Sequence, residues 1–151
     1  MQADAHRDGV EQQIGYLVKR VQQALRGVME RALREHKVTL AQYAALSVLQ
    51  NQPGLSNAEL ARRIFVTAQT MNQVLAGLER SGLVERTAHP GHGRVMQIRL
   101  TEDGERLLAQ CQGATAGIHE RMLAGLPLGE RDRLRALLIH CAEQLERSTG
   151  G

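Results

Sequence analysis

Residues 55–101 restrict the fold of this chain more than any other part of its sequence. Ser56 and Glu59 form an S-x-x-E pattern, in which each side chain bonds a backbone N–H that a helix start leaves unpaired. Thr67 is a suitable cap for a second helix. Gly82 marks its end, because glycine tolerates the left-handed conformation that follows many helices. Two helices joined by a tight turn are therefore predicted.

Two short strands are predicted after these helices. Residues 84–87 and 95–100 have the composition of strands, and residues 89–94, His-Pro-Gly-His-Gly-Arg, have that of a turn. The order of elements is that of a winged helix-turn-helix, in which the second helix lies in the major groove of DNA. Double-stranded DNA is therefore the expected partner.

The second of these helices has two chemically different faces. Its apolar residues fall on one stripe, and its amide side chains fall toward the opposite side together with Arg80. The apolar stripe comprises Met71, Val74, Leu75 and Leu78, and the amides are Gln69, Asn72 and Gln73. We expect the stripe to be buried and the amides to face solvent.

Longer helices flank this segment. Apolar spacing predicts helices over about 11–36, from Thr39, from Thr101 through Leu123, and from about Glu130, with frayed tails at 1–10 and 148–151. The fold class is mostly α with a small β wing. We expect a single domain over 1–151, with the DNA-binding part at about 39–101 and dimerisation helices at about 11–36 and 101–147.

The apolar faces of the flanking helices are too extensive for a small winged unit to cover. A second copy of the chain would cover them, and a two-fold dimer would place two recognition helices about one DNA turn apart on a pseudo-palindrome. A monomeric helical bundle is the alternative. We predict the homodimer.

Composition narrows the class of protein. A length of 151 residues suits one ordinary domain, and no apolar run is long enough for a membrane span or a signal peptide. Cys111 and Cys141 are far apart and outside any CxxC motif, so neither a disulfide framework nor a zinc site is indicated. We expect a cytoplasmic protein with no membrane partner and no cofactor.

The charge lies where a DNA-binding protein needs it. The net charge is +3, and residues 56–99 carry six Lys or Arg against three Asp or Glu. Aromatic residues amount to 2% of the chain, which argues against a stacking platform for single-stranded nucleic acid. Duplex DNA remains the favoured partner.

Several stretches together resemble the MarR family of bacterial transcriptional regulators. The similarity covers roughly residues 11–147, and it rests on the order and spacing of the stretches 40–46, 55–63, 67–72, 78–86 and 92–104 taken together. The resemblance implies a homodimer with interlocking terminal helices that binds a palindromic operator. Either repression or activation is compatible with the sequence, and repression by occluding a promoter is the simpler mechanism for a chain with no separate activation surface. The resemblance also implies release by a small aromatic ligand or by oxidation.

The resemblance places the helix after Thr67 in the major groove. Amide groups there can pair with adenine, and threonine can bond phosphate or touch a thymine methyl. The helix start near Ser56 can receive a phosphate oxygen. The predicted contacts are Ser56, Thr67, Gln69, Thr70, Asn72 and Gln73.

The resemblance also assigns roles in the wing. Arg94 matches an arginine that enters the minor groove, and Arg86 would support the wing or touch phosphate. His92 is a further expected DNA contact in the wing, at a position where many family members have an aspartate. We expect a looser wing here, which becomes more basic below about pH 6.5.

The resemblance favours a small-molecule switch, a planar aromatic acid or phenol, with Arg20, His36, Tyr43 and Met96 as the residues that line its site. Cysteine oxidation is an alternative switch. The six histidines include no H-x-x-x-H pair, so no metal site is predicted. The chain also lacks G-x-S-x-G, H-E-x-x-H and phosphate-loop motifs, which argues against an enzyme. A winged helix that binds another protein remains the alternative to a DNA-binding one.

Overall fold

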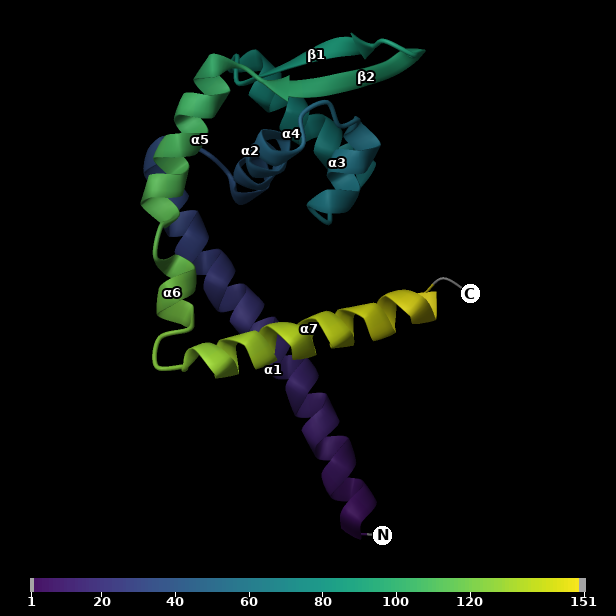
Figure 1. Cartoon of the computed structure of the whole chain (residues 1–151), viewed down its shortest axis with the longest axis vertical. Coiled ribbons are helices and arrows are strands. Elements are labelled where there is room, and N and C mark those ends of the chain that lie inside the picture. The colour runs from purple at the N-terminus through teal and green to yellow at the C-terminus, as the bar shows by residue number, and fades with distance from the viewer. Residues whose placement is uncertain (1, 150–151) are drawn as a thin grey trace. The chain divides into compact units, whose positions relative to one another are not determined.

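The computed structural model describes residues 2–149, and for residues 2–8, 89, 92 and 94 it describes the backbone alone. The chain divides into two compact units, Met1–Ala116 and Gly117–Gly151. The first unit holds helices α1 to α5 and the two strands, and the second holds α6 and α7 (Figure 1). The predicted fold class, mostly α with a small β wing, is confirmed. No helix among the described residues is long and apolar enough to cross a membrane.

Helix α1 spans Gln2–Leu33. The predicted start near residue 11 and the frayed tail are wrong, because residues 2–10 contain no proline and continue the helix. The predicted end at 36 is also displaced: Arg34–His36 is a 3-10 turn that closes on Lys37, whose φ is 55°. Thr39 then caps α2, Leu40–Asn51, and forms the predicted capping box with Gln42.

One core joins the helix-turn-helix to the wing. It takes residues from α2, α3 (Asn57–Arg63), α4 (Ala68–Arg80) and α5 (Glu102–Thr115), and from strands β1 (Val84–His89) and β2 (His92–Leu100). In Figure 1, α2, α3 and α4 lie together on one side of the two strands. The buried residues are Ala45, Leu46, Leu49, Leu60, Ala61, Met71, Leu75, Leu78, Val84, Ile98 and Leu108.

The wing is longer than predicted. Strands β1 and β2 pair antiparallel from Val84 opposite Leu100 to His89 opposite His92, so Pro90 and Gly91 alone form the turn. The predicted loop over 89–94 is therefore wrong, because both strands extend to the turn, with a shift of register between Ala88 and His89. An isolated antiparallel bridge between Leu55 and Ile98 of β2 was not predicted. Ile98 N–H donates to the Leu55 carbonyl at 3.0 Å, and Gly54 N–H donates to the Ile98 carbonyl at 3.0 Å.

The predicted fifth helix is two helices. Helix α5 ends at Thr115, and α6, Ile118–Met122, begins after Gly117, whose φ of 80° is left-handed. The Thr115 hydroxyl bonds the Cys111 carbonyl at 3.0 Å within the last turn of α5. The sequence predicted one helix because the apolar spacing continues across this break, and the spacing of apolar residues carries no information on the backbone conformation at Gly117. Helix α7, Leu128–Thr149, begins two residues before the predicted start.

The turn after α4 is held tightly against the start of α5. The Thr101 hydroxyl donates to the Gly82 carbonyl at 2.6 Å, and Thr101 N–H donates to the Leu83 carbonyl at 3.1 Å. Gly104 lies in the first turn of α5, where a Cβ would overlap the Leu83 carbonyl. The close approach therefore requires glycine at 104.

We expect Gly104→Ala to lower the free energy of unfolding by about 1–3 kcal/mol, because the added methyl must push the turn away from α5. Urea denaturation measures the loss. Gly113→Ala is the matched control: it is on the same helix, and its Cβ would meet no atom within 4 Å. That control should stabilise the chain by up to about 1 kcal/mol. Equal stability of the two variants would contradict the packing argument.

Candidate nucleic-acid interface

Ser56 fixes the start of α3. Its hydroxyl accepts the Glu59 N–H at 3.2 Å, and the Glu59 carboxylate accepts the Ser56 N–H at 2.8 Å. The hydrogen bonds from the Ser56 backbone and side chain, with Arg62 and Arg63 nearby, lower the pKa of Glu59. Both functional groups are thus occupied in the cap, as the S-x-x-E pattern predicted.

Thr67 fixes the start of α4 in the same way. Its hydroxyl accepts the Thr70 N–H at 3.1 Å and donates its own proton to the Thr70 hydroxyl at 3.0 Å. The Thr70 hydroxyl therefore accepts a bond and still has a proton to donate. Thr67 serves mainly to position Thr70, which is the better placed of the two to bond a phosphate or base acceptor.

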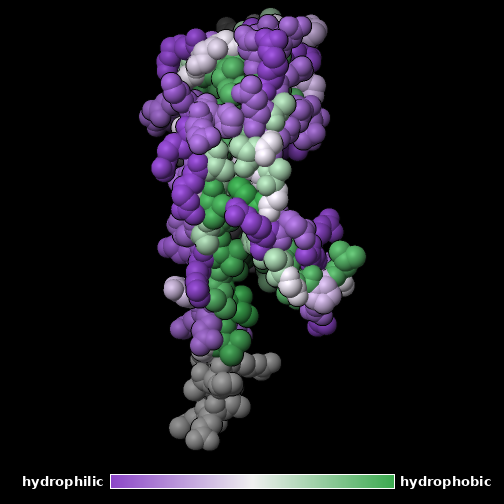
Figure 2. All heavy atoms as spheres, turned by 90° about the vertical axis from the view of Figure 1, so that its left-hand side faces the viewer, coloured by the Kyte–Doolittle hydropathy of each residue, from purple (hydrophilic) through white to green (hydrophobic). Residues whose placement is uncertain are grey.

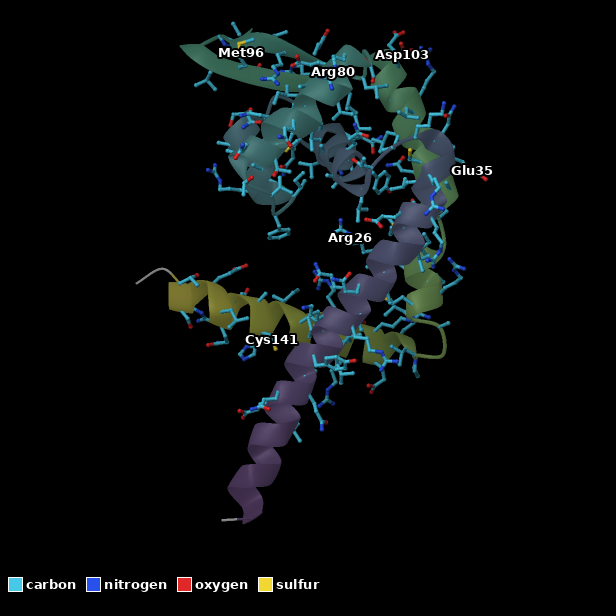
Figure 3. The ribbon with its side chains drawn as sticks, turned by 180° about the vertical axis from the view of Figure 1, so that it is seen from behind. Arg26, Glu35, Arg80, Met96, Asp103 and Cys141 are labelled. Atoms are coloured by element: carbon cyan, nitrogen blue, oxygen red, sulfur yellow. The ribbon has the colours of Figure 1, made fainter. Side chains whose placement is uncertain are left out.

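The exposed face of α4 is rich in hydrogen-bonding groups. Gln69, Asn72 and Gln73 are exposed, whereas Met71, Leu75 and Leu78 are buried. The amides are exposed as predicted, and of the predicted stripe these three residues are buried and Val74 is half-buried. Arg80 is also exposed, at the wing end of the helix (Figure 3). The face offers amide and hydroxyl groups on a helix whose apolar side is fixed in the core.

An ion pair ties the wing to α4. The Arg86 guanidinium on β1 contacts the Glu79 carboxylate in the last turn of α4, and both side chains are partly exposed. Arg86 was predicted either to support the wing or to touch phosphate. The ion pair with Glu79 is consistent with the first role. The backbones of His92 and Arg94 lie in β2, where His92 is opposite His89, and their side chains lie outside the described part of the chain.

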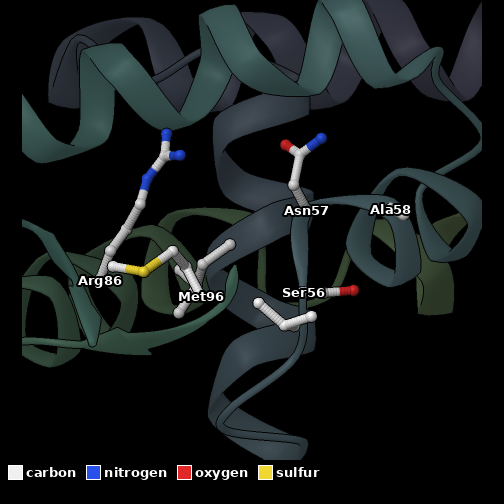
Figure 4. A pocket seen from close by; sticks show the side chains of 7 residues that line it. Ser56, Asn57, Ala58, Arg86 and Met96 are labelled. Atoms are coloured by element: carbon white, nitrogen blue, oxygen red, sulfur yellow. The ribbon is translucent and has the colours of Figure 1, made fainter. Parts of the chain in front are cut away.

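A hollow of about 300 Å³ lies between the start of α3 and the wing. Asn57 and Arg86 extend into it from opposite sides, with Met96 and Ser56 below (Figure 4). Asn57 bridges α3 to α4 through a long bond of 3.5 Å to the Ala68 carbonyl, and its Oδ1 is buried with no partner among the described residues. Sequence reasoning missed Asn57 and Glu79, because neither residue belongs to a local pattern.

The residues predicted to line a ligand site lie on separate elements. Tyr43 on α2 reaches α5, where its hydroxyl is 3.2 Å from the Thr115 hydroxyl. His36 is half-buried in the 3-10 turn, and Arg20 is exposed on α1. Met96 is on the wing, across the unit from Glu35, the neighbour of His36 (Figure 3). The structure thus places Met96 in the hollow with Asn57 and apart from Tyr43.

The two cysteines differ in environment. Cys111 is buried in a second small core with Leu33 and Val38, and burial raises the pKa of its thiol. Cys141 is exposed on α7. Among residues 2–149, no group of three His, Cys, Asp or Glu side chains is arranged to hold a metal ion.

Comparison with known proteins assigns the family. A model described as MarR family matches residues 36–95. The HTH-type transcriptional repressor Rv2887 of Mycobacterium tuberculosis is 37% identical over 125 residues, which are 83% of this chain and 90% of that protein.

Two solved structures share the fold. The repressor CouR bound to a 23-mer DNA duplex has a TM-score of 0.78 and 28% identity over 88% of this chain and 94% of its own. The Rv2887 complex with salicylic acid has a TM-score of 0.67 and 36% identity over 84% of this chain and 94% of its own. With its capped helix pair and its wing, this chain belongs to the MarR family of transcriptional regulators.

Proposed function

We propose that this chain is a homodimeric repressor that binds a pseudo-palindromic DNA operator and is released from it by a small aromatic ligand. The observation that carries the proposal is the exposed amide and hydroxyl face of α4, held beside a paired wing. The relative CouR, solved on a DNA duplex, supports the same use of this fold.

The chemistry of α4 suits the edges of base pairs. Gln69, Asn72 and Gln73 present amides that can bond adenine N6 and N7 in the major groove. Thr70 presents a hydroxyl that suits a phosphate, with Thr67 positioning it, and Ser56 lies at a helix start that suits another. In this assignment α4 contacts the bases, and α3 fixes the position of α4 on the phosphate backbone of the DNA.

The exposed apolar side chains of the terminal helices support the homodimer. On α1, Ile14, Leu17, Val18 and Val21 are each about half exposed, and Figure 2 shows apolar atoms gathered along this helix. On α7, no residue is buried, although Leu137, Leu138 and Leu145 are apolar. Contiguous exposed apolar surface of this kind marks an interface.

An aromatic acid is the proposed ligand class, because the relative Rv2887 has been solved with salicylic acid. Arg20 and His36 would supply positive or hydrogen-bonding groups, and Tyr43 an aromatic wall. The place of Met96 on the wing, across the unit from Glu35, separates it from the His36 end of the proposed site. Oxidation of Cys111 is less favoured, because its thiol is buried in the small core with Leu33 and Val38.

Selection of bound fragments from random duplex DNA tests the function directly. We expect a pseudo-palindrome whose affinity falls steeply with salt, by roughly one log-log unit for each phosphate neutralised. A winged helix that binds proteins would select no sequence and would show no such salt slope.

Arg94→Ala should weaken operator binding at least tenfold, because an arginine in a narrow minor groove interacts with strong negative potential. Fluorescence anisotropy at matched salt measures the change. Arg106→Ala on α5, which also removes one positive charge, is the control and should change affinity little. Equal affinities for the two variants would exclude Arg94 from the interface.

Glu79→Gln should loosen the wing, because it removes the partner of Arg86 while keeping the side-chain shape. We expect a loss of about 0.5–1 kcal/mol in stability, faster amide exchange in β1 and operator binding weakened severalfold. Glu85→Gln, which removes the same charge from an exposed site on β1, is the control. Removal of a negative charge alone favours DNA binding, so weaker binding in Glu79→Gln and not in Glu85→Gln isolates the ion pair.

Salicylate should lower operator affinity at least tenfold in the wild type when it is added in large excess. Arg20→Ala and His36→Ala should each reduce this response without changing affinity in the absence of salicylate. Titration of the preformed complex followed by anisotropy measures the effect. A response that both variants retain in full would place the ligand elsewhere.

A further inference from the structure

Phe65 occupies a backbone conformation that favours glycine. It lies in the turn between α3 and α4 with φ of 60°. Helix α3 ends there in a Schellman motif, in which Val66 N–H donates to the Ala61 carbonyl at 3.1 Å. The position that follows the helix cap in this motif is normally glycine, because a Cβ is disfavoured in the left-handed region. A phenylalanine at this position is therefore unfavourable for the turn.

Burial does not compensate for this conformation. The Phe65 side chain is 91% exposed, although its neighbours Ile64 and Val66 pack against the core. It is also the one phenylalanine in the sequence. A side chain that favours neither the turn nor the core is best explained by a contact outside the chain.

The surroundings of Phe65 favour DNA as that contact. Phe65 precedes the Thr67 cap of α4 by two residues, and Arg62 and Arg63, both exposed, precede it at the end of α3. In helix-turn-helix proteins the first helix crosses the DNA backbone, and the amino end of the second contacts bases. The turn between them lies where phosphates meet the groove.

A second copy of this chain fits the same surface poorly. Contact between two Phe65 side chains would bring two pairs of arginines together, and like charges at an interface repel. The arginines suit phosphates, and the apolar group that a major groove offers to a phenyl ring is the thymine methyl.

We propose that Phe65 packs against a thymine methyl at the edge of the major groove, beside the bases contacted by α4, and thereby contributes to operator specificity. The inference rests on the proposed DNA-binding function. It adds an apolar contact to the hydrogen bonds assigned to Gln69 and Asn72.

Phe65→Gly separates the contact from folding, because glycine relieves the backbone. The variant should melt at a higher temperature than the wild type and yet bind the selected operator at least fivefold more weakly. Lys37→Gly is the matched control, since Lys37 is also exposed and left-handed, with φ of 55°. It should raise the melting temperature and leave operator affinity unchanged.

Operators in which single thymines are replaced by deoxyuridine identify the methyl group. One replacement in each half-site should weaken binding by the wild type severalfold and have no effect on Phe65→Gly. Phe65→Leu should keep part of this sensitivity. Sedimentation of both proteins shows whether the dimer is altered.

Equal operator affinity for Phe65→Gly and the wild type would overturn the proposal. A loss that is the same on every thymine and deoxyuridine duplex would also overturn it, as would a loss that follows from dissociation of the dimer. If the wild type selected no operator and showed no salt slope, the proposed function itself would fail. Failure of the Phe65 contact alone would leave that slope intact.

Discussion

The burial of one stripe of α4 determines how the rest of the first unit is arranged. Met71, Leu75 and Leu78 are at most 1% exposed, in a core shared with α2, α3, the wing and α5. Because the stripe is fixed, the opposite face, with Gln69, Asn72 and Gln73, must face solvent. The wing belongs to the same core through Val84 and Ile98. Any movement of α4 would therefore be transmitted to the wing, and the Arg86–Glu79 ion pair adds a polar link at the same junction.

The parts of the fold that were predicted correctly depend on residues close together in the sequence. Thr39, Ser56, Thr67 and Thr101 each cap a helix by bonding an N–H three residues later, and the printed sequence shows both partners. The stripe of α4 is likewise a local pattern. The same logic explains the errors: the break at Gly117 depends on a backbone angle, and the extension of the wing to Pro90 depends on pairing between strands.

In the candidate site, too, the residues predicted correctly are those that depend on local sequence. The exposed amides of α4 follow from helical spacing, so the sequence predicted where they point. Glu79 and Asn57 acquire their roles only when α3, α4 and β1 come together, and no spacing rule links Glu79 to Arg86. The predicted ligand residues show the greater difficulty: Tyr43 meets Thr115 across 72 positions of sequence, and Met96 lies on a different side of the unit. A site assembled from distant segments cannot be deduced from any one of them.

The features that are unfavourable in an isolated monomer are those that the proposed dimer and its complex with DNA would use. The apolar residues of α1 and α7 are exposed, and Phe65 is both exposed and left-handed. By contrast, the tight contact between Gly104 and Leu83 uses the smallest residue where the fold requires it, so the sequence does accommodate local backbone demands. Phe65 is the exception to that pattern within the helix-turn-helix. Because glycine at 65 would serve the turn better, the phenyl ring is most simply explained by what it contacts on the bound DNA, which makes the turn itself part of the reading surface.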